Sequence, residues 1–345
     1  MVAIGARTPV GLRAESSAAA VRAGIRRLTL HPSLLDGAGE PLRCARDGLL
    51  EAGQWGVARA VELGKSALNE VLEKLGQAGV RTARARLLLA LPDPRPGFSA
   101  SEADLIAASL QSAPAPAALR LQVEPVGGGH AAGLRALELA LDHLAQGQDD
   151  LCIVGGLDSH LDLPTLAWLD DGRRLARKGV RGGFTPGEGA AMLALMTPAA
   201  RVHFKVPSLA RIRAVAVARE PRSLDSDAGL LGEGLTEVVG RVVSGLRLPD
   251  DQVDDIYCDI NGERHRTDEW GFTVMRHASA LRDGTAYQSP SSSWGDVGAA
   301  SAPLGCVLAV QAWRRGYARG PRALVWASSP AGLRGAALLE NDAAA

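Results

Sequence analysis

The chain has 345 residues, of which 46% are hydrophobic and 22% are charged, and its formal net charge is zero. These values are typical of a globular protein large enough to bury a sizeable core, and they argue against intrinsic disorder and against a small modular binder. Because the positive and negative side chains balance, no overall field would attract nucleic acid or an anionic membrane, and neither partner is expected.

Cysteine usage and the first residues indicate the compartment. Cys44, Cys152, Cys258 and Cys306 stand far apart, without the paired spacing of metal sites or small disulfide frameworks, so we expect reduced and mostly buried thiols. The N-terminus has no basic region followed by an apolar core, and no apolar run reaches the ~18 residues typical of a membrane span. We expect a cytoplasmic protein without a cofactor or a metal.

Hydrophobic periodicity predicts strands that alternate with helices along the chain. In chain order we expect a strand at 2–4, helices at 16–23 and 56–75, a strand at 86–91, a helix at 103–110, a strand at 119–123, a helix at 131–145, strands at 150–156 and 192–196, a helix at 235–246, a strand at 255–260, a helix at 299–313 and a strand at 323–329. Segments 26–53 and 158–181 lack such periodicity and are predicted to be loop excursions, and 340–345 is predicted to be a frayed tail. The alternation predicts a layered α/β fold.

The second half of the chain repeats the plan of the first. The first correspondence pairs helix 235–246 and strand 255–260 with helix 66–75 and strand 86–91. The second pairs the glycine turn 295–298 and helix 299–313 with the turn 127–129 and helix 131–145. The third pairs strand 323–329 with strand 150–156. We therefore expect two related halves, 1–200 and 201–345, each a sheet covered by helices. Their glycine turns should face one another across a shared site.

The stretch from Val123 to His130 has the architecture of an active site. An extended piece ends in Gly127, Gly128 and Gly129, and a helix begins at once, which is the geometry of a nucleophile elbow. No Ser, Cys or Thr lies between Val123 and His130, so this elbow presents no side chain able to attack a carbonyl. The glycines are then better interpreted as a structural hinge.

Several strings, in this order along the chain, resemble the β-ketoacyl synthases and their thiolase-like fold. They are VAIGARTPVG at 2–11, AGI at 23–25, TPGEGAA at 185–191 and GDVGAAS at 295–301. The resemblance covers nearly the whole chain. It implies two pseudo-repeated halves in a layered α-β-α-β-α arrangement.

The resemblance also implies where catalytic residues should stand. The family's condensation chemistry uses a cysteine nucleophile at a helix start and two histidines that stabilise the carbonyl oxyanion. The corresponding positions here hold Val126, or Pro125 if the glycines are shifted by one, together with Asn261 and Asp296. These residues imply that condensing activity is lost, and the negative charge of Asp296 would also oppose decarboxylation, because the oxyanion develops there.

Other side chains near the elbow are candidates for a vestigial pocket. The set consists of Gly127, Gly128, Gly129, His130, Glu263, His265, Ser328 and Ser329. His130 could be a general base, and His265 could join Glu263 and Asp296 in a hydrolytic or metal site. The structural alternatives are that His130 packs at a helix start and that His265 is a loop residue.

A second candidate metal site is the alternating trio Asp158, His160 and Asp162. The alternative is an ordinary loop that faces water. This alternative is preferred.

Three functions are compatible with these residues. The first is a catalytically inactive pseudoenzyme that binds a protein as a chaperone, adaptor or scaffold, with a secreted effector of a bacterial type VI secretion system as one partner. The second is the non-catalytic partner of an active ketosynthase, like a chain-length factor in fatty acid or polyketide synthesis. The third is a repurposed acyl-transferring or hydrolysing enzyme that uses His130, His265 and Asp296. The resemblance further implies a homodimer or heterodimer through the thiolase-type interface.

Overall fold

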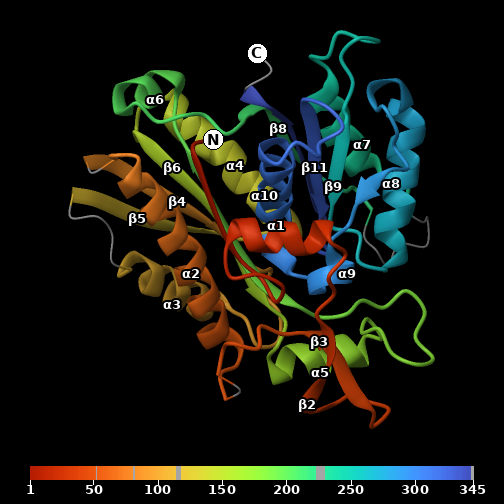
Figure 1. Ribbon diagram of the computed structural model, residues 1–345. Coiled ribbons are helices and arrows are strands. Elements are labelled where there is room, and N and C mark those ends of the chain that lie inside the picture. The colour runs from red at the N-terminus through yellow and green to blue at the C-terminus, as the bar shows by residue number, and fades with distance from the viewer. Residues whose placement is uncertain (52, 81, 114–117, 223–229, 343–345) are drawn as a thin grey trace.

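Two five-stranded sheets with the same internal plan form the frame of the protein (Figure 1). A computed structural model describes residues 1–51, 53–80, 82–113, 118–222 and 230–342. The strands of the first sheet are β1 (Ala3–Arg7), β4 (Thr82–Ala90), β5 (Ala118–Val126), β6 (Leu151–Ser159) and β7 (Glu188–Leu195). Those of the second sheet are β8 (Arg211–Arg219), β9 (Asp255–Cys258), β10 (Tyr287–Gln288), β11 (Arg322–Ser328) and β12 (Leu333–Glu340).

The strand order shows the internal repeat directly. The first sheet has the order β5-β4-β6-β7-β1 and the second has β10-β9-β11-β12-β8, so the five strands of each sheet follow one permutation. Strand directions agree as well, because the first three strands in each order are parallel and the last two pairings are antiparallel. The predicted pseudo-repeat of the fold is confirmed.

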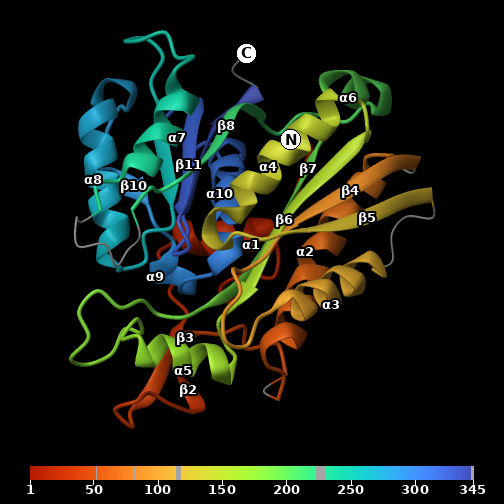
Figure 2. The ribbon, with the colours of Figure 1, turned by 180° about the vertical axis from the view of Figure 1, so that it is seen from behind.

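Helices form three layers around the two sheets (Figure 2). α2 (Gly56–Gln77) and α3 (Ala100–Gln111) cover the outer face of the first sheet, and α7 (Glu233–Val243) covers the second sheet with α8 (Arg264–His277) packed beside it. α4 (Ala132–Ala145) and α10 (Ser301–Arg314) lie between the sheets, and α1 (Ala14–Arg22) packs on α10. The predicted α-β-α-β-α layering is confirmed.

Burial in the central layer explains why α10 is so poor in large polar residues. α10 is buried from Ala302 to Ala312 because it contacts strands of both sheets and α4. α4 and α10 approach each other closely at Gly133, where an added Cβ would lie 2.5 Å from Pro303 Cδ. A side chain at this position would push the two central helices apart.

The predicted loop excursions are wrong in part. Segment 26–53 contains an antiparallel hairpin of β2 (Leu28–Leu35) and β3 (Pro41–Ala45), and segment 158–181 contains the end of β6 and α5 (Leu163–Asp171). β2 is mostly exposed and contains Pro32, so the alternation of apolar and polar residues at 28–31 is too short to mark it as a strand. Asp162 caps α5 by accepting a hydrogen bond from Thr165 N, and a proline follows in the first turn, which is a helix start that could have been recognised.

Several other elements are absent from the sequence prediction. These are α6 (Pro198–Phe204), β8, α8, α9 (Ser291–Trp294), β10, β12 and three short 3-10 helices at Gly129–Ala131, Ala278–Ala280 and Gly298–Ala300. The predicted tail begins inside β12, whose last residue is Glu340, and residues 343–345 lie outside the described part. Across the described ranges, no helix is both long and apolar enough to cross a bilayer.

Candidate functional site

The elbow lies where β5 ends and α4 begins, between the two halves. Gly128 and Gly129 have φ values of +131° and +63°, in the region that favours glycine, which lets the chain turn at once from strand to helix. Ser329 from the second half holds this turn: its Oγ donates to Gly128 O at 2.5 Å and accepts from Ala131 N at 2.9 Å. Both halves therefore shape the elbow.

His130 and Asp296 form the centre of the site. Both side chains are buried, and His130 Nε2 lies 2.9 and 3.0 Å from the two carboxylate oxygens of Asp296. A carboxylate only accepts hydrogen bonds, so His130 Nε2 is the donor. Asp296 also accepts from Asn261 Nδ2 at 2.5 Å and from Gly298 N at 2.9 Å. The carboxylate of Asp296 is thus surrounded by donors.

The electrostatics keep these acids ionised. Burial alone would raise the pKa of Asp296, but His130, His160 and Arg266 hold it well below its ordinary range. Burial likewise opposes ionisation of Glu263, yet Arg266 and Arg174 lower its pKa to about 2. At neutral pH the floor of the site therefore carries two carboxylates.

The structure brings some predicted site residues together and separates others. Asn261 joins Asp296 and Glu263, because its Nδ2 lies 3.2 Å from Glu263 Oε2 and its Oδ1 accepts from Glu263 N at 2.9 Å. Val126 instead packs into the hydrophobic core between the sheets. The elbow side chain that meets Asp296 is His130, four residues further on.

The remaining predicted residues serve the surrounding network. Ser328 Oγ donates to Glu269 Oε2 at 2.8 Å, and Glu269 is in turn paired with Arg334. His265 lies in the first turn of α8 with a buried Nε2 that has no hydrogen-bond partner. Burial and the nearby Arg266 lower the pKa of His265 to about 3, so its ring is neutral.

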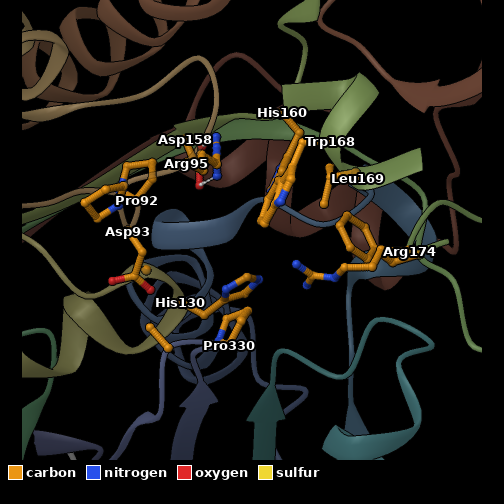
Figure 3. A pocket seen from close by; sticks show the side chains of 14 residues that line it. Pro92, Asp93, Arg95, His130, Asp158, His160, Trp168, Leu169, Arg174 and Pro330 are labelled. Atoms are coloured by element: carbon orange, nitrogen blue, oxygen red, sulfur yellow. Dashed lines mark hydrogen bonds and ion pairs between the residues drawn. The ribbon is translucent and has the colours of Figure 1, made fainter. Parts of the chain in front are cut away.

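A cavity of ≈ 220 Å³ opens beside His130 (Figure 3). The side chains that line it include Asp93, Arg95, His130, Asp158, His160, Trp168, Arg174 and Phe184. His160 Nε2 lies 3.9 Å from Asp296 Oδ1, and its buried Nδ1 has no hydrogen-bond partner. Burial lowers the pKa of His160 and raises that of Asp93.

Sequence reasoning missed most of the cavity walls, although a signal exists. Asp93 and Arg95 follow β4, and His160 follows β6, and these are neighbouring parallel strands. The carboxyl ends of parallel strands meet at one edge of a sheet, so polar residues just after each strand are candidates for one site.

The two arginines of the cavity are already paired within the protein. Arg95 Nη2 lies 2.6 Å from Asp158 Oδ1, and Arg174 Nη2 lies 2.7 Å from Glu263 Oε1. The guanidinium of Arg174 also lies 5.6 Å from the ring centroid of Trp168 and 5.4 Å from that of Phe184. Asp93 is the acid of this cavity without an ion pair among the described residues.

The proposed metal trio does not converge. Asp158 pairs with Arg95, Asp162 caps α5, and His160 faces Asp296. Within the residues that the structure describes, no group of three or more His, Cys, Asp or Glu side chains is arranged to hold a metal ion.

All four cysteines are buried thiols. Burial raises the pKa of Cys44 to about 11 and those of Cys152 and Cys306 to about 12, and it also raises that of Cys258. Cys258 lies closest to the site, in a small pocket lined by Asn261 and Asp296, but its Sγ is directed to Gln288 O at 3.7 Å. None of the four is a thiolate at neutral pH.

Comparisons with known proteins agree with this fold. Residues 125–200 match the model of the β-ketoacyl synthase N-terminal domain family, and no curated protein matches the chain in sequence. The ishigamide ketosynthase/chain length factor is similar in structure with a TM-score of 0.80 and 15% identity, over 99% of this chain and 98% of that one. The ketosynthase from module 6 of the bacillaene synthase from Bacillus subtilis 168 has a TM-score of 0.76 and 12% identity, over 99% of this chain and 71% of that one.

A third similar structure is AntDE:AntF, a type II polyketide synthase acyl-carrier protein in complex with its ketosynthase. Its TM-score is 0.77 and its identity 13%, over 99% of this chain and 98% of that one. The predicted β-ketoacyl-synthase-like, thiolase-like fold is confirmed.

Proposed function

We propose that this chain is a non-condensing ketosynthase-like protein that works by binding a protein partner. The observation that supports it is the His130–Asp296–Asn261 cluster at the elbow, where His130 Nε2 and Asn261 Nδ2 both donate to one buried carboxylate. On the resemblance to condensing enzymes, Asn261 and Asp296 replace the two histidines. We infer that His130, rather than Val126, stands at the position of the cysteine, because it is the elbow side chain that contacts Asp296.

The chemistry of this cluster opposes condensation. An acyl transfer needs a nucleophile and hydrogen-bond donors aimed at the developing oxyanion. Among the described residues the site offers no thiolate, and the donors at its centre are directed at the Asp296 carboxylate, which is itself an anion. A carbonyl that gains negative charge there would be repelled by the Asp296 carboxylate.

The retained frame supports a role in assembly. β5 is an edge strand of the first sheet, and such an edge is open to pairing with another chain. The similar ishigamide and AntDE:AntF structures contain a chain length factor and a carrier protein as partners of a ketosynthase. The partner of this chain is then either a ketosynthase-like subunit or another protein, such as a secreted effector that the fold holds as a chaperone.

Two measurements test this proposal. Purified protein incubated with acyl- and malonyl-carrier protein should give no covalent adduct by intact mass and no condensation product. Co-expression with a candidate ketosynthase or effector should give a stable complex by size exclusion. Condensation that disappears in Asn261→Ala or Asp296→Ala would contradict the proposal.

Variants that restore the catalytic residues of the resembled enzymes provide a further test of the proposal. Val126→Cys alone should give no condensing activity, because its side chain lies in the core and the oxyanion is still opposed by Asp296. His130→Cys alone should also fail. The triple variant His130→Cys, Asn261→His, Asp296→His should be the first to show alkylation by iodoacetamide at residue 130.

A repurposed hydrolase is the second candidate, because His130 is oriented by Asp296 and lines a cavity. In that case His130→Gln should abolish hydrolysis of an acyl thioester, because the glutamine side chain is similar to imidazole in size and polarity but cannot act as a general base. If wild-type and His130→Gln proteins hydrolyse it equally slowly, this candidate is rejected.

A further inference from the structure

Two segments that are far apart in the sequence form one projecting module. The β2–β3 hairpin and the 163–186 segment lie together at one end of the molecule, away from the two sheets (Figure 1). Leu42 from the hairpin packs with Leu166, Leu169, Leu175 and Phe184 in a small separate core. Gly37 N donates to Asp170 Oδ2, and Ala45 N donates to Pro186 O at 2.9 Å.

A groove of ≈ 620 Å³ runs between the two parts of this module. Leu30, Pro41 and Arg43 line its hairpin side, and Leu175, Lys178 and Val180 line the other. Leu30 is 59% exposed, and Leu35 on the same strand is 65% exposed. Large apolar side chains on the rim of a groove, with charged ones between them, mark an interaction surface.

Positive charge dominates the part of this surface that the 163–186 segment contributes. Residues 172–187 contain five basic side chains and no acidic one. Two of the five are paired inside the protein, Arg174 with Glu263 and Arg177 with Asp170. The other three are Arg173, Lys178 and Arg181, and none of them has an acidic partner within the described residues. Arg43, across the groove, has no such partner either.

The groove is lined by two acids, Asp36 and Glu40, and by three cations, Arg43, Arg177 and Lys178, and Arg173 and Arg181 of the same segment add further positive charge to the module. Asp36 and Glu40 lie together at the hairpin turn, and Asp36 Oδ1 is already used, because it accepts from Ala38 N and Glu40 N. Away from this turn, the groove combines the exposed Leu30 and the half-buried Val180 with the cations Arg43 and Lys178, which have no acidic partner among the described residues. Charge complementarity then selects an occupant that is both acidic and apolar.

We propose that this groove docks an extended segment of a partner protein in which acidic residues alternate with large apolar ones. The acids would meet Arg43 and Lys178, and the apolar side chains would cover Leu30 and Val180. The inference specifies the surface used by the protein-binding role proposed above, and it concerns a face remote from the edge strand β5.

A peptide-binding experiment tests the docking groove. The probe is a fluorescent peptide of alternating Glu and Leu, and the control peptide has Lys in place of Glu. The Glu peptide should bind the wild-type protein and the Lys peptide should not. Arg43→Glu with Lys178→Glu should weaken binding of the Glu peptide by about tenfold or more, and Leu30→Ser should weaken it as well.

A matched control keeps the net charge equal. Arg84→Glu with Arg247→Glu changes two exposed arginines elsewhere on the surface and should leave the affinity unchanged. Absence of binding by the wild-type protein, or equal weakening by the control pair, would overturn the proposal.

Competition by single-stranded DNA or phosphatidylglycerol vesicles is a further control. If they displace the Glu peptide as well as unlabelled peptide does, and Leu30→Ser has no effect, the groove is a general polyanion surface and the proposal is overturned. These outcomes are independent of the condensation assays. A failed docking test therefore leaves the non-condensing proposal standing.

Discussion

The elbow and the projecting hairpin module differ in whether their charged side chains are paired. At the elbow, Asp296 and Glu263 are buried and surrounded by donors from both halves. On the module, Lys178 and Arg43 face solvent without an acidic partner among the described residues. The two elbow carboxylates are thus committed to contacts that join the halves, while these two cations of the module remain available to a partner.

The largest expected effect comes from breaking a buried pair that ties the hairpin segment to α2 and the first sheet. Arg59 Nε lies 2.7 Å from Glu188 Oε2, and Glu188 Oε1 accepts from Asp47 N at the end of the hairpin segment. Arg59→Met should lower the free energy of unfolding by about 3–5 kcal/mol, because it leaves a fully buried carboxylate unpaired. Chemical denaturation measures this loss.

The double variant Arg59→Met, Glu188→Gln is the control for that loss. Removing the unpaired charge should recover part of the stability. A single Arg59→Met protein as stable as wild type would contradict the interpretation that this pair anchors the module.

The second effect is the pH dependence of Glu263. Its folded-state pKa of about 2 is below the ordinary 4.5, so its ionised form stabilises the fold above pH 4.5, and this contribution is lost as pH falls toward 2. Wild type should exceed Glu263→Gln in unfolding free energy by roughly 3 kcal/mol at neutral pH. The difference should shrink below pH 4.5 in urea titrations across pH. A difference that stays constant down to about pH 3 would be incompatible with this assignment.

A smaller effect is expected at the elbow itself. Gly129 has a φ of +63°, and an added Cβ would lie 2.7 Å from Asp93 Oδ2. Gly129→Ala should cost roughly 1–2 kcal/mol by thermal or chemical denaturation. Gly147→Ala is the matched control, because its φ is +68° but nothing lies within 4 Å. Equal costs at both positions would show that the crowding by Asp93 is unimportant.

The smallest effect belongs to the module. Arg43→Glu with Lys178→Glu should change the free energy of unfolding by no more than about 0.5 kcal/mol, because exposed unpaired charges contribute little to stability. A large loss would mean that these cations support the fold, and the contrast with the elbow would fail.

The sequence predicts the layers of this protein well and its surface poorly. Buried strands such as β6 and β7 and helices such as α2 carry apolar periodicity, because each buries a defined face. The exposed hairpin strand β2 alternates only over 28–31 before Pro32, so its residues indicate a loop. The local pattern of apolar residues indicates which face of an element is buried. It gives no signal for a strand that is solvated on both faces.

The candidate site shows a similar limit. Motif order places Asn261 and Asp296 at one site, and they do share a hydrogen bond. The role of His130 and the walls formed by Arg95, His160 and Arg174 depend on contacts between segments distant in sequence. No local spacing encodes such contacts, and they become visible only when the parallel strands are placed side by side.

The bridge from Ser329 to the elbow has a consequence for how the protein is made. Ser329 Oγ contacts Gly128 O and Ala131 N, which precede it by 201 and 198 residues. A ribosome therefore releases the whole elbow long before the hydroxyl that fixes it exists, and contacts of such long range form late in folding. During synthesis the elbow of the first half therefore lacks these two hydrogen bonds until Ser329, the residue after β11, has been made, and the nascent chain is open to misassembly for that time.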